Sequence, residues 1–151
     1  MFSWYLVLTL LHILSAIVAV GSNITYGIWN VRAAGDPSHM GFALKGIKFI
    51  DDRVANPAYG VLLLTGLIMM FAGNWGFALW IIISLILFAA IVVLGLAFYS
   101  PLLKNQIRLA EAGETASPEF ARLSALGRRF GPGLGIIVLA ILVLMVFKPH
   151  L

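Results

Sequence analysis

The sequence predicts an all-α integral membrane protein, a four-transmembrane-helix bundle that forms one domain over residues 1–151. Composition is the first reason, because 62% hydrophobic residues and a mean hydropathy of +1.03 exceed the values of soluble domains. Four apolar stretches are the second, at about residues 2–29, 57–72, 77–99 and 131–147. Each has roughly the length that crosses a bilayer core. The third is the distribution of charge.

Nine of the ten Lys and Arg residues lie in two connections, residues 30–56 and 100–130, while the connection 73–76 carries none. Because cationic loops stay cytoplasmic, we expect these two connections inside and both termini on the outer, periplasmic side of a bacterial inner membrane. All six acids lie in the same connections. Topology and attraction to lipid headgroups account for the basic pI, so the expected partner is the lipid bilayer and not nucleic acid.

The chain contains no cysteine. This excludes disulfides, thiolate nucleophiles, Cys-ligated iron–sulfur clusters and covalent c-type haem. The first apolar stretch has no positively charged start and exceeds the length of a signal core, so we expect it to remain in the protein.

One face of the first span is polar or small at every position. Its members recur at spacings of three and four, as on one side of a helix: Tyr5, Thr9, His12, Ala16, Ala19, Asn23, Tyr26 and Asn30. Polar groups in hydrocarbon turn inward, so this stripe is expected to face the bundle core.

The connection 30–56 predicts an amphipathic cytoplasmic helix, whose apolar side is Leu44, Ile47, Ile50 and Val54. Pro57 then kinks the join or begins a new helix. In the connection 100–130, residues 102–112 predict a polar helical continuation of the third span.

A second helix is expected to begin at Ser117, as N-cap, and Pro118. Gly127, Gly131 and Gly135 recur every four residues, which fits a hinge, a helix-packing ridge, or both.

A shift of 75 residues aligns the two halves of the chain. Arg53 overlays Arg128, Pro57 overlays Pro132 and Gly60 overlays Gly135. The match predicts two tandem helical hairpins related by a pseudo-twofold axis along the membrane normal. His12 overlays a leucine, so the buried polar groups break the symmetry.

His12 is the candidate metal ligand, since it is the ionisable side chain that the pattern places inside the membrane, roughly 14 Å below the outer surface. A neutral imidazole there can ligate haem iron, relay protons or hydrogen-bond across helices, for instance to Thr65. His39 and His150 lie at other depths. The open alternatives are a five-coordinate haem, a sixth ligand from Met69, Met70 or Met145, or a haem shared across a dimer.

Asp51, Asp52 and Arg53 lie where the second span enters the membrane, and fit either a polar binding site or a solvated helix end. The candidate cofactor-binding residues are therefore His12, Asn23, Tyr26 and Arg53. No zinc-ligand spacing, phosphate loop or catalytic triad is present in the sequence.

Four segments carry a resemblance to a known family: residues 11–15 (LHILS), 20–21 (VG), 51–57 (DDRVANP) and 65–67 (TGL). Together they resemble a bacterial domain-of-unknown-function family of small four-helix predicted integral membrane proteins. More distantly, the pattern is similar to copper-resistance D-type proteins and to the haem b-binding bacterial protoporphyrinogen oxidases. The resemblance to those oxidases implies a functional role for His12, the match of their essential first-helix histidine. Their third-helix lysine has no counterpart in residues 80–98.

A b-type haem or porphyrin-binding, redox-related membrane protein is the leading hypothesis. The alternatives are an accessory subunit of a larger membrane complex and a small transporter, either of them as a homo-oligomer or with other partners. The transporter would use the polar stripe near Asn23 and Tyr26 as its path, although no intramembrane carboxylate is evident to couple ions.

Overall fold

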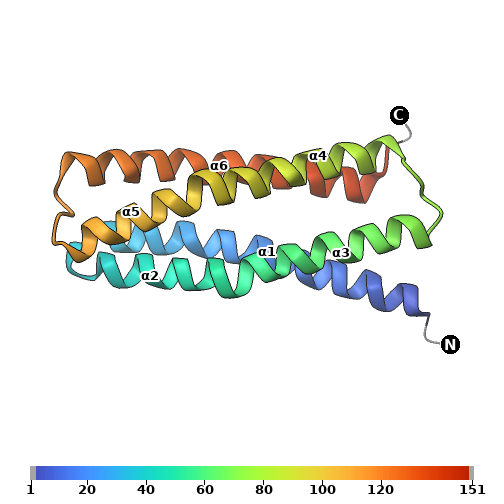
Figure 1. Ribbon diagram of the computed structural model, residues 1–151, viewed down its shortest axis with the longest axis horizontal. Coiled ribbons are helices and arrows are strands. Elements are labelled where there is room, and N and C mark those ends of the chain that lie inside the picture. The colour runs from blue at the N-terminus through green and yellow to red at the C-terminus, as the bar shows by residue number, and fades with distance from the viewer. Residues whose placement is uncertain (1–2, 150–151) are drawn as a thin grey trace.

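The computed structural model describes residues 3–149, and the described chain is helical and contains no strand (Figure 1). Four continuous helical columns are each long and apolar enough to cross a membrane, as the sequence predicted. The elements are, in order, α1 (Trp4–Ala34), η1 (Pro37–His39), α2 (Met40–Ile50), η2 (Asp51–Ala55), α3 (Asn56–Ala72), α4 (Leu79–Leu94), η3 (Gly95–Tyr99), α5 (Ser100–Glu111) and α6 (Pro118–Phe147).

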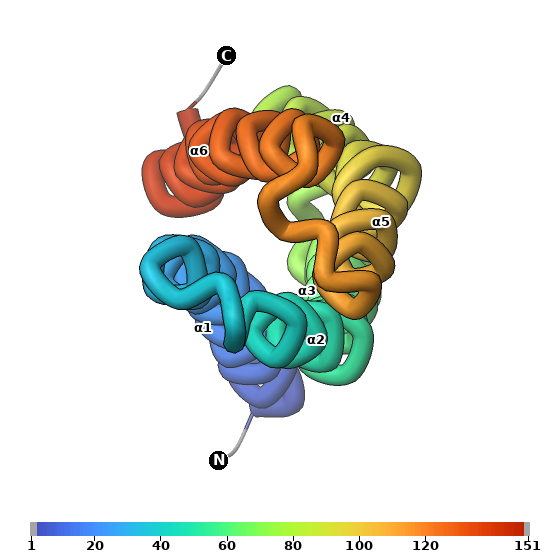
Figure 2. The backbone as a smooth tube through the Cα atoms, turned by 90° about the vertical axis from the view of Figure 1, so that its left-hand side faces the viewer, coloured from blue at the N-terminus to red at the C-terminus, as the bar shows by residue number. Residues whose placement is uncertain are grey.

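The columns form two hairpins. In the first, α1 packs along α2 and α3, and in the second, α6 packs along α4 and α5. The hairpins meet chiefly where α2 lies against α5, as Figure 2 shows from one end of the bundle. Both termini and the α3–α4 connection lie at one end, the termini end. The α1–α2 turn (residues 35–39) and the α5–α6 turn (112–117) lie at the other, which we call the basic end.

The second and third columns each contain one π-helical turn, η2 and η3, and each turn ends two residues before a proline, Pro57 or Pro101. Proline lacks the N–H for the helical hydrogen bond, and its ring collides with the carbonyl four residues earlier. A turn with one extra residue removes the collision while the helix continues. The proline therefore widens the column instead of ending it.

This extra residue corrects one expectation from periodicity. Leu44 and Ile47 are fully buried as predicted, but Val54 is 38% exposed and its neighbour Ala55 is 0% exposed. The π turn shifts the buried face by one residue, so the pattern read from α2 fails beyond Asp51.

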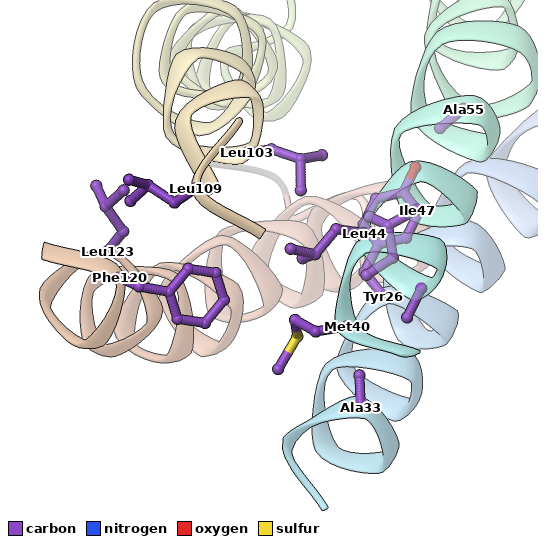
Figure 3. Close-up of a cluster of buried hydrophobic side chains, with 11 residues drawn as sticks. Tyr26, Ala33, Met40, Leu44, Ile47, Ala55, Leu103, Leu109, Phe120 and Leu123 are labelled. Carbon is purple, nitrogen blue, oxygen red and sulfur yellow. The ribbon is translucent and has the colours of Figure 1, made fainter. Parts of the chain in front are cut away.

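The buried side chains gather at the basic end. Eleven residues from both hairpins form one apolar cluster there, ten of which Figure 3 labels: Tyr26, Ala33, Met40, Leu44, Ile47, Ala55, Leu103, Leu109, Phe120 and Leu123. Ala43 is the eleventh. The second cluster, at the termini end, contains Met70, Trp80 and Ile81.

The last column begins as predicted, because the Ser117 side chain accepts a hydrogen bond from the Phe120 backbone N–H at 3.1 Å. From there α6 runs without a break through Pro132 to Phe147. The apolar segment 131–147 is thus the second half of a longer helix. A Cβ atom added at Gly131 or Gly135 would meet nothing within 4 Å, so within the described chain these glycines are not a packing ridge.

The local helix geometry does not follow the 75-residue shift. That shift places the π turn η2 on residues 126–130 of α6, which are regular α-helix, and η3 on residues 20–24 of α1, which are also regular. The proline match at Pro57 and Pro132 thus has two different structural outcomes.

Candidate functional site

The polar stripe of α1 pairs with the second column, which runs antiparallel to it. The pairs descend from the termini end in order: Tyr5 with Trp75, Thr9 with Met69, His12 with Thr65, Asn23 with Tyr59, and Tyr26 with Asp51. The stripe is expected to face the bundle core, and all its members are buried or half-buried. Their partners lie on α3 and η2 and, for Tyr5, in the α3–α4 connection at Trp75.

His12 and Thr65 define the first group of the site. The His12 Nδ1 atom lies 3.0 Å from Thr65 Oγ1, and the Thr65 hydroxyl donates its single proton to the Val61 carbonyl at 2.7 Å. Because Thr65 can donate its proton to Val61, we assign Thr65 as the acceptor from His12; this assignment places the imidazole proton on Nδ1 and the lone pair on Nε2. A second partner that fixes the tautomer in this way is typical of histidines whose other nitrogen binds a metal.

Gly66 allows the imidazole to lie against α3. A Cβ atom built at Gly66 would come within 3.0 Å of His12 Cε1 and 3.5 Å of Nδ1. The distance to Cε1 is tighter than ordinary van der Waals contact. A side chain at this position would push the ring away from Thr65, so Thr65 and Gly66 together determine where His12 lies.

The second group of the site lies nearer the basic end. Asn23 Nδ2 donates to the Tyr59 hydroxyl, and the Tyr26 hydroxyl lies 3.3 Å from Asp51 Oδ1. The Tyr26 ring also stacks on Tyr99, with ring centroids 6.2 Å apart and planes 12° apart. The π turn η2 carries Asp51 and η3 carries Tyr99, so each widened turn contributes one residue to this group.

The sequence candidates do not form a single site. His12 and Asn23 are eleven residues apart on one helix, which corresponds to roughly 16 Å. Asn23 and Tyr26 lie together in the second group, but Arg53 is exposed to the outside of η2 and takes no part in the described contacts. The structure thus separates the histidine from the other three candidates.

Tyr59 is the residue of the second group that sequence reasoning did not single out. A signal existed, because Tyr59 is the one side chain with a polar group among residues 57–64 of an otherwise apolar segment. Its partner Asn23 could not be deduced, since the π turn changes the register between α1 and the second column.

Within residues 3–149, no three His, Asp or Glu side chains gather as a group that could hold a metal ion. The methionines weighed as a sixth haem ligand belong to the termini end. The Met69 sulfur lies 3.4 Å from Thr9 Oγ1, Met70 is buried beside Trp80, and Met145 packs on the same cluster. His12 is therefore the one haem-ligand candidate whose free lone pair the contacts support.

Comparison with known protein families shows which family the chain belongs to. Residues 6–149 match the family model described as predicted integral membrane protein (DUF2269). The chain belongs to this family. The match covers nearly the whole described bundle, including both groups of the site, and agrees with the four candidate spans. No curated protein and no solved structure matches the chain.

Proposed function

We propose that this member of the family binds a b-type haem or a related porphyrin, which His12 would hold through Nε2. The observation that supports this most directly is the Thr65 contact, because an imidazole that donates from Nδ1 carries its lone pair on Nε2. Bound haem would supply one-electron redox chemistry. Thr65 and Gly66 would orient the His12 imidazole. Asn23 and Tyr26 lie on the same face of α1, nearer the basic end.

The fit of such a group at His12 is partial within one chain. Two cavities, of about 210 and 290 Å³, lie at the α1–α2 turn and between α4 and α6, and His12 lines neither. Its side chain is half-buried. A porphyrin at His12 would thus be covered in part by lipid or by a second copy of the chain. A haem shared between two His12 residues accords with the single histidine that each chain contributes at this depth, and predicts one haem for two chains.

An absorption spectrum of the detergent-purified protein, oxidised by air and then reduced by dithionite, tests the proposal. We expect a Soret band that shifts on reduction and is lost in His12→Ala. His39→Ala is the matched control, because it removes a histidine at the basic end and should keep the band. Full haem retention in a folded His12→Ala variant, or no chromophore after haem is added back, would overturn the proposal.

Thr65→Val adds a second, finer test. Valine keeps the shape of threonine but cannot accept the Nδ1 proton, so the tautomer is no longer fixed. Loss of an outer partner of a ligand histidine commonly weakens metal affinity about 10- to 100-fold. We expect haem binding to persist at reduced affinity in a heme titration, and an unchanged affinity would contradict the assigned role of Thr65.

For location, we propose a bacterial inner membrane with both termini on the periplasmic side. The concentration of cations at the basic end supports this orientation. Because the chain has no cysteine, the labelling of single-cysteine variants measures the orientation without background from native thiols. Ser38→Cys at the basic end should react with an impermeant maleimide only in broken cells, and Asn74→Cys at the termini end should react in cells with a permeabilised outer membrane. The reverse pattern would refute the orientation.

An accessory subunit of a larger membrane complex is the second candidate, and one observation favours it. The apolar half of α6 has no buried residue, since the buried side chains of α6 are Phe120 and Leu123. That half contacts mainly α4, which leaves its remaining surface for lipid or another protein. This candidate predicts co-purifying partners that are lost in Gly131→Leu, while the bundle itself stays folded.

A further inference from the structure

We propose that the basic end contains a binding site for the phosphate headgroup of an anionic phospholipid. The site is the cavity of about 210 Å³ at the α1–α2 turn, and it is lined by Trp29, Arg32, Ala33, Asp36, His39, Phe42 and Ala43. Its volume is below the roughly 300–1,000 Å³ of ordinary small-molecule pockets. It therefore suits a compact headgroup whose acyl chains extend outside the cavity.

The positive charge of the site comes from Arg32. Among the described residues, ion pairs join Lys45 with Glu111, Lys48 with Asp52, Arg108 with Glu119 and His39 with Asp36. None of these pairs includes Arg32. A guanidinium presents several N–H donors in a plane and binds phosphate oxygens in pairs. Arg32 lines the cavity at the last turn of α1, so these donors are available to a headgroup there.

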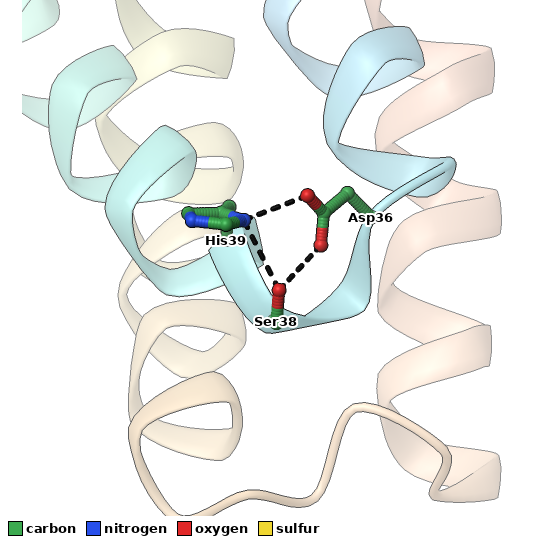
Figure 4. A network of polar contacts seen from close by, with 3 residues as sticks. All are labelled: Asp36, Ser38 and His39. Carbon is green, nitrogen blue, oxygen red and sulfur yellow. Dashed lines mark hydrogen bonds and ion pairs between the residues drawn. The ribbon is translucent and has the colours of Figure 1, made fainter.

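Asp36 also lines the cavity, and its carboxylate is held by Ser38 and His39. The Ser38 hydroxyl donates to Asp36 Oδ1 at 2.5 Å, and His39 Nδ1 lies 2.7 Å from Oδ2 (Figure 4). The hydrogen bond from Ser38 contributes most and the one from His39 next to lowering the pKa of Asp36, so its carboxylate remains an ionised acceptor. The other ring nitrogen of His39 points away from Asp36 in Figure 4.

The aromatic residues of the cavity indicate a lipid and not a soluble phosphate. Phe42 is 75% exposed and Trp29 is 40% exposed, beside charged residues at the end of the bundle. Aromatic side chains of this kind gather at the depth of lipid headgroups. A soluble anion would leave both rings in water, whereas a phospholipid would cover them with its glycerol and the first methylenes of its chains. Basic pockets between membrane helices are a known mode of binding anionic lipids.

Native mass spectrometry of the detergent-purified protein tests this proposal with dioleoylphosphatidylglycerol as the probe. Dioleoylphosphatidylcholine, with identical chains, is the comparison lipid. We expect phosphatidylglycerol adducts to be retained preferentially, and Arg32→Gln to lower them about fivefold, the loss expected for one cation near an anionic surface. Arg122→Gln is the matched control. It removes the same charge from an exposed position on α6 that lines neither cavity, and should leave adduct formation unchanged.

Three outcomes would overturn the proposal. Equal losses in Arg32→Gln and Arg122→Gln would mean that net charge alone retains the lipid. Equal retention of the two lipids would remove the role of the anionic headgroup. Displacement of phosphatidylglycerol by excess inorganic phosphate would indicate a site for a soluble anion. Arg32 and Arg122 are both exposed, so neither variant is expected to prevent folding.

Discussion

The two ends of the bundle are held together by different means. At the basic end, eleven buried residues from both hairpins form one apolar cluster, whereas three do so at the termini end. Between them, α1 and α3 are joined by polar pairs such as His12 with Thr65. The 36-residue second column is about 54 Å long, which exceeds a bilayer core of about 30 Å.

The difference follows from the solvent. The hydrophobic effect requires water, so a dense apolar core is expected where columns project beyond hydrocarbon, and the charged connections at the basic end fit such a position. Inside the bilayer lipid chains are as apolar as leucine, and helices associate through close packing and hydrogen bonds instead. The basic end should therefore behave like a soluble domain, and the membrane region should tolerate loss of apolar bulk.

The largest predicted effect is at the core of the basic end. Leu44 is 0% exposed, and Leu44→Ala should lower the free energy of unfolding by about 2–5 kcal/mol, because it leaves a cavity among packed side chains. Leu139→Ala is the control, since Leu139 is 61% exposed on α6. Unfolding in mixed detergent micelles measures both. Equal effects would mean that the two regions do not differ.

The second prediction concerns close contact at the termini end. A Cβ atom at Gly73 would lie 2.5 Å from Trp75 Cδ1 and 2.9 Å from the Met69 carbonyl oxygen. Gly73→Ala should displace Trp75, break its hydrogen bond to Tyr5 and cost about 1–3 kcal/mol of unfolding free energy. Gly60→Ala has open space and should not destabilise the protein. We expect the tryptophan emission of Gly73→Ala to shift to the red, because the displaced Trp75 ring becomes more exposed to water. A blue-shifted or unchanged emission spectrum would contradict this displacement.

A smaller effect is expected for a polar pair within the membrane. Tyr59→Phe removes the acceptor of the Asn23 amide, and a double-mutant cycle with Asn23→Ala should give a coupling of about 0.6 kcal/mol, and at most about 1.7 kcal/mol. A coupling of zero would show that the pair contributes nothing to the stability of the α1–α3 contact.

The smallest effect should come from the ion pair between Lys45 on α2 and Glu111 on α5. Both side chains are more than half exposed, so a double-mutant cycle with alanine should yield about 0.2–1 kcal/mol. The coupling energy should fall further in 1 M salt, where the Debye screening length is about 3 Å. A coupling well above 1 kcal/mol that falls in salt would mean that charge, and not only Leu44 and its neighbours, joins the hairpins.

The sequence predicted several elements well because each depends on local chemistry. The Ser117 cap, the buried pair Leu44 and Ile47, and the inward turn of the α1 stripe all follow from spacing along one helix. It failed at Val54, because an extra residue in η2 rotates everything beyond it. It also grouped Arg53 with His12, although the two belong to different faces and depths.

The sequence by itself determined that this is an integral membrane protein with four candidate spans, because apolar length decides whether a helix can cross a bilayer. Only the tertiary structure decided which helix the α1 stripe meets, which side chain His12 Nδ1 contacts, and that the Arg32 cavity exists. These depend on how two columns align after a π turn, and the alignment is set by packing between segments that are far apart in the chain.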